Sequence, residues 1–241
     1  GGTTATDHVG GNAEETVGAI GLQPSGRILV AGVVPTPPWG HGGVAVDRYL
    51  ANTPPTVAVA GGGACSGDDT AEVRLAVADA ETPAGDLTVT ATASDTGVVP
   101  DGRVDTGEGG GERTLTLAPS TRAGGSTVMT VTVDDGDLSA TTTIGVLVGA
   151  AGRDDLAGSA SADVLIGRQG DDTLGGGGGP DVLCGGVGDD TLDGGGGDDH
   201  LAGGRGDDDL VGGPGHDSFS GGTGVDAVAD AAAGEEVTGT P

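Results

Sequence analysis

Nine aspartates recur at intervals of nine residues in the C-terminal third of the chain. A hard cation such as calcium takes about 6–8 oxygen ligands, and a periodic row of carboxylates can supply them at many positions. A single catalytic pocket needs one unique set of residues, whereas these acids repeat. The pattern therefore predicts a metal-binding array. Its aspartates are Asp154, Asp163, Asp172, Asp181, Asp190, Asp199, Asp208, Asp217 and Asp226.

The repeating unit is G-G-x-G-x-D-x-U-x, where U is apolar, and its first copy begins at Gly149. Nine consecutive units keep both the aspartate and the apolar residue, which low-complexity sequence of this composition would not do. Glycine permits left-handed backbone at tight turns and lets carbonyl oxygens crowd a cation. We therefore expect an ordered repeat and not a flexible acidic linker. The apolar place holds Leu156, Leu165, Leu174, Leu183, Leu192, Leu201, Leu210, Phe219 and Val228.

Residues 149–229 resemble the hemolysin-type calcium-binding repeats of RTX proteins in all nine units. The resemblance implies a parallel β-roll in which two successive units form one turn, with a glycine loop and a short strand per unit. Loops two units apart would stack, so that a calcium ion lies between their aspartates and backbone carbonyls complete its ligands. As many as seven ions would fit. One column would contain Asp154, Asp172, Asp190, Asp208 and Asp226, and the other Asp163, Asp181, Asp199 and Asp217.

The charge of the chain supports this interpretation. The chain has 37 acids, 9 arginines and no lysine, and its net charge is −28. Residues 150–241 hold 19 acids and 3 arginines, a net charge of −16, which seven calcium ions would offset by about +14. At a dissociation constant near 10⁻⁴ M and ~1 mM calcium, each ion adds about 1.4 kcal/mol and seven add about 10 kcal/mol. We expect the roll to be disordered inside a cell and to fold outside it.

Residues 53–148 alternate between apolar and polar residues, as in "EVRLAVAD", "LTVTATAS" and "TVMTVTVDDG". Threonine and valine dominate and turns recur about every 8–12 residues, which predicts a β-sandwich. The stretch "VTVDDGDLSATTTIGVLV" resembles cadherin-like and immunoglobulin-like repeats of bacterial surface and secreted proteins. Some relatives of such domains bind calcium at their ends. For Asp134, Asp135 and Asp137 we favour turn chemistry over a calcium site, because Asp-Gly is a hairpin turn sequence.

The N-terminal residues 1–52 contain short alternating runs at 17–22, 27–31 and 43–50, which predict strands between Pro and Gly turns. "AIGLQPSGRILVAG" and "VAVDRYL" resemble a delta-60-type repeat of bacterial β-propellers. Because a propeller needs several blades, we expect a partial blade whose companions lie upstream. Residues 230–241 lack the repeat and are expected to cap the roll. The expected fold is all-β: a partial propeller blade, a β-sandwich and a C-terminal parallel β-roll.

Several function classes are disfavoured by the sequence. The absence of lysine excludes a Walker phosphate loop and Schiff-base chemistry. The acidic charge disfavours nucleic acid as a partner, and no apolar run approaches the ~18–20 residues of a membrane span. No G-x-S-x-G, H-E-x-x-H or Ser/His/Asp arrangement appears in the sequence. We therefore expect no enzymatic activity in this chain, although a catalytic domain upstream is compatible with it.

The cysteines, the histidines of the repeats and the acids beside the sixth place lie outside the repeat consensus. For Cys65 and Cys184 we favour two unpaired thiols, with a bridge between domains as the alternative. His200 and His216 occupy variable places of the repeat and are expected to face solvent. Arg205-Gly206-Asp207 spells an integrin-type tripeptide that the repeat pattern already dictates, so we treat it as coincidence. Acids at the fifth place are interpreted as solvated charge, with added attraction for a cation as the alternative; they are Asp171, Asp189, Asp198 and Asp207.

The glycine pattern ranks the expected calcium sites. The first three units read "GAAGRD", "GSASAD" and "GRQGDD" and lack the second glycine, whereas every unit from Gly176 onward keeps glycine at places one, two and four. Other residues at turns that need a positive φ cost about 1 kcal/mol or more. We expect the Asp154/Asp172 and Asp163/Asp181 sites to be the weakest. Folding should then begin in the C-terminal half of the roll.

The expected function is calcium binding by tandem repeats in a secreted or cell-surface bacterial protein. Two other roles agree with the same residues: a C-terminal secretion and stability tail of an upstream hydrolase, or the stalk of an adhesin. Upstream sequence would separate them, because it would contain either a catalytic motif or many sandwich copies. The sequence specifies neither a protein or carbohydrate partner, nor the secretion route, nor the oligomeric state.

Overall fold

The computed structural model describes residues 52–67, 69–100, 110–120 and 124–229, and the backbone of five further strands at 16–22, 28–34, 43–49, 103–105 and 236–238. These residues belong to two compact units, 1–53 and 54–241. Almost all of the described secondary structure is β, and the one helix among these residues is the 3₁₀ turn η1 (Ala84–Asp86). None of the described helices could cross a membrane. The expected all-β class is confirmed.

The first unit contains a three-stranded antiparallel sheet in the order β1-β2-β3. Its strands are β1 (Thr16–Leu22), β2 (Ile28–Val34) and β3 (Gly43–Tyr49). They coincide with the three alternating runs expected from the sequence. A three-stranded meander is compatible with part of a propeller blade, and that assignment stays a prediction. His8 and His41 of this unit lie outside the described residues.

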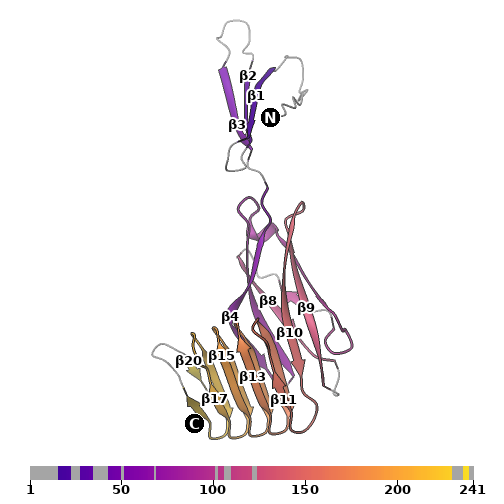
Figure 1. Cartoon of the computed structure of the whole chain (residues 1–241), viewed down its shortest axis with the longest axis vertical. Coiled ribbons are helices and arrows are strands. Elements are labelled where there is room, and N and C mark those ends of the chain that lie inside the picture. The colour runs from indigo at the N-terminus through magenta and orange to yellow at the C-terminus, as the bar shows by residue number, and fades with distance from the viewer. Residues whose placement is uncertain are drawn as a thin grey trace. The chain divides into compact units, whose positions relative to one another are not determined.

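Two sheets face each other in the N-terminal part of the second unit (Figure 1). One has the order β4-β5-β8-β7; the other contains β6, β9 and β10. Alternate residues of both enter a shared core, among them Leu75 from β5 and Val131 from β9. Two facing sheets agree with the expected sandwich, whose cadherin-like identity stays a prediction. The strands are β4 (Thr56–Ser66), β5 (Thr70–Ala78), β6 (Thr88–Ala93), β7 (Arg103–Asp105), β8 (Glu112–Leu117), β9 (Gly125–Asp134) and β10 (Ser139–Val148).

The nonapeptide repeats form a parallel β-roll, as expected. Successive units place their strands alternately in two parallel sheets, and each strand pairs with the one 18 residues later, as Leu165 with Leu183 and Leu174 with Leu192. Two units therefore make one turn. One sheet holds β12 (Asp163–Gln169), β14 (Val182–Val187), β16 (His200–Arg205) and β18 (Ser218–Thr223). The other holds β11 (Asp155–Ala157), β13 (Thr173–Gly178), β15 (Thr191–Gly196), β17 (Asp209–Val211) and β19 (Ala227–Ala229).

The sandwich and the roll share a sheet. β10 pairs antiparallel with β9 and parallel with β12, with Gly145 opposite Asp163 and Val148 opposite Ile166. An eight-stranded sheet results, in the order β20-β18-β16-β14-β12-β10-β9-β6, and β20 (Glu236–Thr238) lies at its end beside β18. The sheet continues without a break through residue 148, where the sequence analysis placed a domain boundary.

Apolar residues cover both faces of this shared sheet. On the inner face, Leu165, Leu183, Leu201 and Phe219 belong to the core of the roll. On the outer face, the residues flanking each inward leucine point the opposite way. In the second and fourth units these flanking residues are apolar, "VLI" and "VLC", and they join the core of the sandwich. The four-stranded sheet of the sandwich therefore packs on the outside of the roll.

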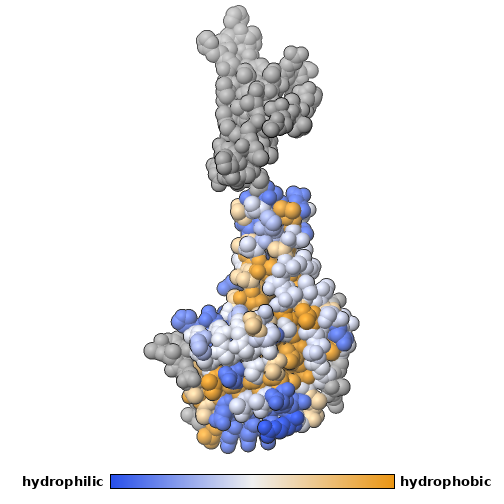
Figure 2. All heavy atoms as spheres, viewed as in Figure 1, coloured by the Kyte–Doolittle hydropathy of each residue, from blue (hydrophilic) through white to orange (hydrophobic). Residues whose placement is uncertain are grey.

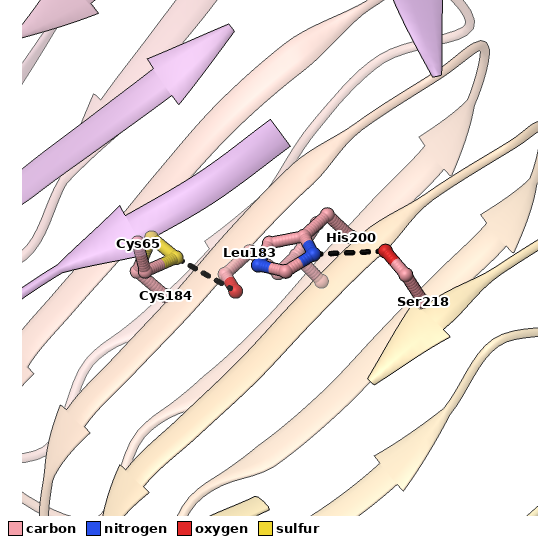
Figure 3. The surroundings of a disulfide bond; sticks show 5 residues. All are labelled: Cys65, Leu183, Cys184, His200 and Ser218. Atoms are coloured by element: carbon pink, nitrogen blue, oxygen red, sulfur yellow. Dashed lines mark hydrogen bonds between the residues drawn. A yellow bond between two sulfur atoms is a disulfide. The ribbon is translucent and has the colours of Figure 1, made fainter. Parts of the chain in front are cut away.

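Cys65 and Cys184 form a disulfide across this interface (Figure 3). The expectation of two unpaired thiols is therefore wrong, and the alternative of a bridge between the two regions holds. Cys184 follows the inward Leu183, so it faces outward toward β4. Its Cys65 partner lies on β4, and the Cys65 Sγ lies 3.6 Å from the Leu183 carbonyl oxygen.

Candidate calcium sites

The nine aspartates stack in the two columns expected from the sequence. Within each column the backbone N–H of one aspartate donates to Oδ1 of the aspartate 18 residues later, for example Asp172 to Asp190 at 2.8 Å. Every consecutive pair makes this bond, from Asp154 to Asp172 in one column and from Asp163 to Asp181 in the other. The seven from Asp163 to Asp217 are at most 4% exposed. The repeat thus carries a row of acids into the protein interior.

The second carboxylate oxygen has no comparable partner in most units. Burying a carboxylate oxygen without a hydrogen bond or counter-charge is costly. A cation beside these oxygens would remove that cost, and this is the first indication from the structure that the residues fit a metal. The buried Oδ2 atoms without a hydrogen-bond partner belong to Asp172, Asp181, Asp190, Asp199, Asp208 and Asp226.

The first glycine of each unit leaves room for these oxygens. A Cβ built on Gly176 would lie 2.5 Å from Asp181 Oδ2 and 2.5 Å from the carbonyl oxygen of Gly194 in the next turn. At Gly194 the corresponding distances, to Asp199 Oδ2 and to the next carbonyl oxygen, are 2.6 and 2.8 Å. A carboxylate oxygen and a backbone carbonyl from different loops therefore border one small space, and calcium uses this combination of ligands.

The loops of the first two units differ from the rest. From the third unit onward, places two and four have a positive φ, as at Gly177 (φ 102°) and Gly179 (φ 91°). In the first two units Ala150 and Ser159 occupy place two without a positive φ. In this conformation the N–H of Ala150 donates to Asp154 Oδ2 at 2.8 Å, and the N–H of Ser159 donates to Asp163 Oδ2 at 2.6 Å. The protein itself stabilises these two carboxylates, which supports the expected weakness of the N-terminal sites.

The third unit keeps the left-handed loop without its glycine. Arg168 at place two has φ 81° and is the only residue other than glycine with a positive φ among the described residues. Its Nε lies 2.7 Å from Asp69 Oδ1 in the turn between β4 and β5. The strained arginine thus joins the roll to the sandwich, a role that the repeat pattern could not indicate.

Burial changes the acidity of the columns. It raises the pKa of Asp181 to about 8 and that of Asp190 to about 7, against the hydrogen bond from the preceding aspartate. Burial also raises the pKa of Asp199 and of Asp208 to about 6. Neighbouring aspartates of the same column add to each shift. Uncompensated carboxylates are therefore unfavourable here at neutral pH, and a divalent cation would reverse the effect.

The composition of the ligands favours calcium among metals. Within the described residues, no three His, Cys, Asp or Glu side chains gather at one point. An ion in the columns would therefore have at most two of these side chains at one point, and its remaining ligands would have to be other oxygens such as backbone carbonyls. Such all-oxygen sites suit calcium, whereas zinc prefers nitrogen and sulfur ligands in tetrahedral geometry.

The acids at the fifth place also connect the loops. Asp171 Oδ1 accepts the N–H of Asp189, Asp189 Oδ1 accepts that of Asp207, and Asp207 Oδ1 accepts that of Val225. Asp198 does the same with His216. These acids are exposed, yet the interpretation as merely solvated charge is incomplete, because they bond one turn to the next. Figure 2 shows hydrophilic residues along the end of the roll where the chain turns.

His200 is only partly exposed, whereas it was expected to face solvent. It lies half-buried on the outer face of β16, with its Nδ1 2.8 Å from Ser218 Oγ (Figure 3). Burial, with a contribution from Arg74, lowers the pKa of His200. His216 is exposed, as expected.

The acids at the expected hairpin of the sandwich make turn contacts. Asp134 Oδ1 accepts the N–H of Gly136 at 2.8 Å, and Asp135 Oδ1 accepts those of Asp137 and Leu138 at 2.8 and 2.7 Å. Side chains that bond the backbone two or three residues on are typical of turns. These contacts agree with turn chemistry, which the sequence analysis favoured over a calcium site.

Comparison with known families agrees with the geometry. Four overlapping copies of the RTX calcium-binding nonapeptide repeat match residues 148–183, 175–210, 184–219 and 203–228. The four matches together span residues 148–228 of the 241 in the chain. Such repeats imply calcium binding, and the family is structural and not catalytic.

The chain is also similar to a solved structure. The crystal structure of the S-layer protein SbsC domains 4 and 5 is 23% identical with a TM-score of 0.27. The match covers 49% of this chain and 63% of the other, less than two thirds of its length. The comparison with curated proteins returned no match.

Proposed function

We propose that residues 149–229 bind as many as seven calcium ions between the aspartates of the two columns, and that this binding folds the roll outside the cell. The observation that carries the proposal is the row of buried Oδ2 atoms without hydrogen-bond partners. Those of Asp172, Asp181, Asp190 and Asp199 lie beside a backbone carbonyl of the next turn, as Asp181 Oδ2 does beside Gly194.

The residues assigned to the ions are the nine sixth-place aspartates. Four ions would lie between successive members of the column that starts at Asp154, and three in the column that starts at Asp163. The Oδ1 bonds within each column hold the carboxylates in place, so Oδ2 and the loop carbonyls remain to face an ion. Bound calcium supplies positive charge that offsets the repulsion within each column.

An extracellular location follows from the required calcium concentration. Sites of the extracellular class need about 10⁻⁴–10⁻³ M calcium, far above the level inside a cell. The disulfide between Cys65 and Cys184 supports the same location, because such bonds persist in oxidising compartments. The protein would therefore be secreted or held at the cell surface, with the roll folding after export.

A calcium titration followed by circular dichroism tests the proposal on the full chain. We expect β-structure to increase cooperatively near millimolar calcium, with little response to magnesium, whose octahedral geometry is stricter. A spectrum that stays the same from chelator to about 10 mM calcium would refute calcium-driven folding. Isothermal titration calorimetry gives the number of ions.

A matched pair of substitutions tests the site assignment. Asp208 is 1% exposed in its column, whereas its neighbour Asp209 is exposed on β17. Asp208→Asn should raise the calcium midpoint, the concentration at half-maximal folding, and Asp209→Asn should leave it almost unchanged. Equal effects of the two variants would show that overall charge, and not the column, binds calcium.

A further inference from the structure

The disulfide joins parts of the chain that meet only when the roll is folded. Cys65 and Cys184 are 119 residues apart in sequence. Cys65 lies on β4 of the sandwich, whereas Cys184 lies on β14 in the middle of the roll. β14 is held by its parallel neighbours β12 and β16 and has no partner in the sandwich sheet of β4. The position of Cys184 therefore depends on the calcium-dependent part of the protein.

The surfaces around the disulfide fit each other closely. β4 contains three consecutive glycines, and its pairing with β5 shifts between Ala60 and Ala64. A Cβ on Gly61 would collide with Asp198 of the roll, and one on Gly63 would collide with Val182. The missing side chains allow β4 to approach the roll, and the Arg168–Asp69 ion pair adds a second link.

We propose that calcium binding controls when this disulfide forms, and that the disulfide then holds the roll in its folded state; we call this arrangement a calcium-gated lock. Calcium folds the roll, folding brings Cys184 to Cys65, and oxidation then fixes β14 to the sandwich. The proposal rests on the proposed calcium function. Its consequence is a memory of calcium: once the bond has formed, the roll stays folded at calcium concentrations too low to fold the reduced chain.

The reaction is a thiol–disulfide exchange with a low-molecular-weight disulfide such as oxidised glutathione. The thiolate of half-buried Cys65 attacks this disulfide, forms a mixed disulfide and releases one thiol. The thiolate of Cys184 then attacks the Cys65 sulfur, closes the bridge and releases the second thiol. The two protein thiols lose two electrons to the reagent, and their two protons leave with the released thiols.

The order of events follows from the positions of the two cysteines. Cys184 is 4% exposed in the folded protein, so it meets small reagents poorly but lies in contact with Cys65. In the unfolded chain the second step must close a loop of more than a hundred residues. In the folded chain it is a reaction between neighbours, and we expect calcium to accelerate it on the order of tenfold or more.

The test uses the reduced full chain and oxidised glutathione, in chelator and in calcium, with circular dichroism recorded in parallel. Samples are quenched with an alkylating reagent, and mass spectrometry separates the bridged chain from the mixed disulfide. We expect fast bridging in calcium and slow bridging, with mixed disulfide accumulating, in chelator. The control chain carries Cys184→Ser and Ala157→Cys, which moves the thiol to β11 in the opposite sheet. Calcium should not accelerate bridging there.

Calcium midpoints of the oxidised and reduced chains test the memory. The disulfide should stabilise the folded chain by the amount that is usual for a loop of this length. Because this stabilisation is spread over the binding of seven ions, we expect the calcium midpoint of the oxidised chain to be about threefold lower than that of the reduced chain. The Cys65→Ser/Cys184→Ser chain should match the reduced chain.

The outcomes separate the two proposals. If circular dichroism shows no response to calcium, the proposed calcium function is refuted, and with it the calcium-gated lock that rests on it. If the roll folds with calcium but bridging is equally fast in chelator, or the control chain is accelerated as much, the gated lock is refuted. Equal midpoints for oxidised and reduced chains refute the memory, and this comparison needs no substitution.

Discussion

The backbone N–H of Asp181 donates to Oδ1 of Asp199 at 2.8 Å, although the two residues belong to different turns of the roll. This contact fixes the distance between successive carboxylates of a column before any ion is considered. It also occupies one oxygen of Asp199 and leaves Oδ2 buried without a hydrogen bond. The backbone thus arranges acids in a geometry that is unfavourable without a cation.

The first prediction ranks the sites. Asp199→Ala and Asp190→Ala should raise the calcium midpoint far more than Asp154→Ala. The reason is that Asp154 Oδ2 already accepts the N–H of Ala150, whereas the corresponding oxygens of Asp190 and Asp199 have no such bond. Calcium titrations followed by circular dichroism measure the three midpoints. Equal shifts would show that the loop backbone does not rank the sites.

The second prediction concerns the glycine at place one. Gly176→Ala should destabilise the calcium-bound roll by about 1–3 kcal/mol, because the new Cβ would meet Asp181 Oδ2 and the Gly194 carbonyl oxygen. Gly175→Ala is the matched control, since nothing lies within 4 Å of a Cβ at that position. Urea unfolding in saturating calcium measures both. A loss of stability in Gly175→Ala as large as in Gly176→Ala would contradict the crowded site.

The third prediction is a pH dependence. In the folded roll the pKa of Asp181 rises from 3.8 to about 8 and that of Asp190 to about 7. Between the ordinary pKa and these raised values, the metal-free roll therefore binds more protons than the unfolded chain. Its stability should be highest below about pH 4 and fall as pH rises from about 4 to about 8. In chelator, circular dichroism should show more β-structure at pH 4 than at pH 8. The reverse order would contradict buried, uncompensated carboxylates.

Competition between protons and calcium follows from the same shifts. Because an ion binds the charged carboxylates, calcium binding to a metal-free roll that is already folded and protonated should release protons. Calcium binding to the disordered chain should release few, because its aspartates are already ionised near neutral pH. Calorimetry in buffers of different ionisation enthalpy measures the released protons. If circular dichroism shows the metal-free roll folded near pH 5 and calcium then releases no protons, the raised pKa values would be contradicted.

The fourth prediction tests the packing of the sandwich on the roll. Val182 and Thr191 occupy the same place of neighbouring units, but Val182 joins the sandwich core and Thr191 is exposed on the opposite sheet. Val182→Thr should lower the free energy of unfolding by about 1–3 kcal/mol, because it buries a hydroxyl. Thr191→Val should change the free energy of unfolding by less than about 0.5 kcal/mol. Thermal or urea unfolding in calcium compares them. Similar effects would place the two residues in similar environments.

The periodic part of the fold was predictable from the sequence. A nine-residue register fixes which residue is inside, which is a turn and which acids stack, because each unit contacts only units of known offset. The interface with the sandwich was not predictable in the same way. It depends on which face of the roll meets a distant segment, and no periodicity of the repeat determines that.

Two local features did mark the interface. "VLI" at Val164–Ile166 and "VLC" at Val182–Cys184 place apolar residues other than alanine on both sides of the inward leucine, which no other unit does. Gly61–Gly63 interrupt an otherwise alternating strand. Taken together they indicate a covered outer face, and they place Cys184 beside a partner strand.

Because each turn of the roll contains two units, the part of the roll before Cys184 can change length only in steps of eighteen residues if the interface with β4 is to survive. Loss of a single nonapeptide between Asp163 and Cys184 would move every later strand to the opposite sheet. Cys184 would then lie on the far side of the roll from Cys65, and the apolar "VLC" would face solvent. Repeats added in pairs beyond Phe219 would leave the disulfide, the ion pair and the packing of β4 untouched. Variation in the number of repeats among natural forms of this chain should therefore be even before Cys184.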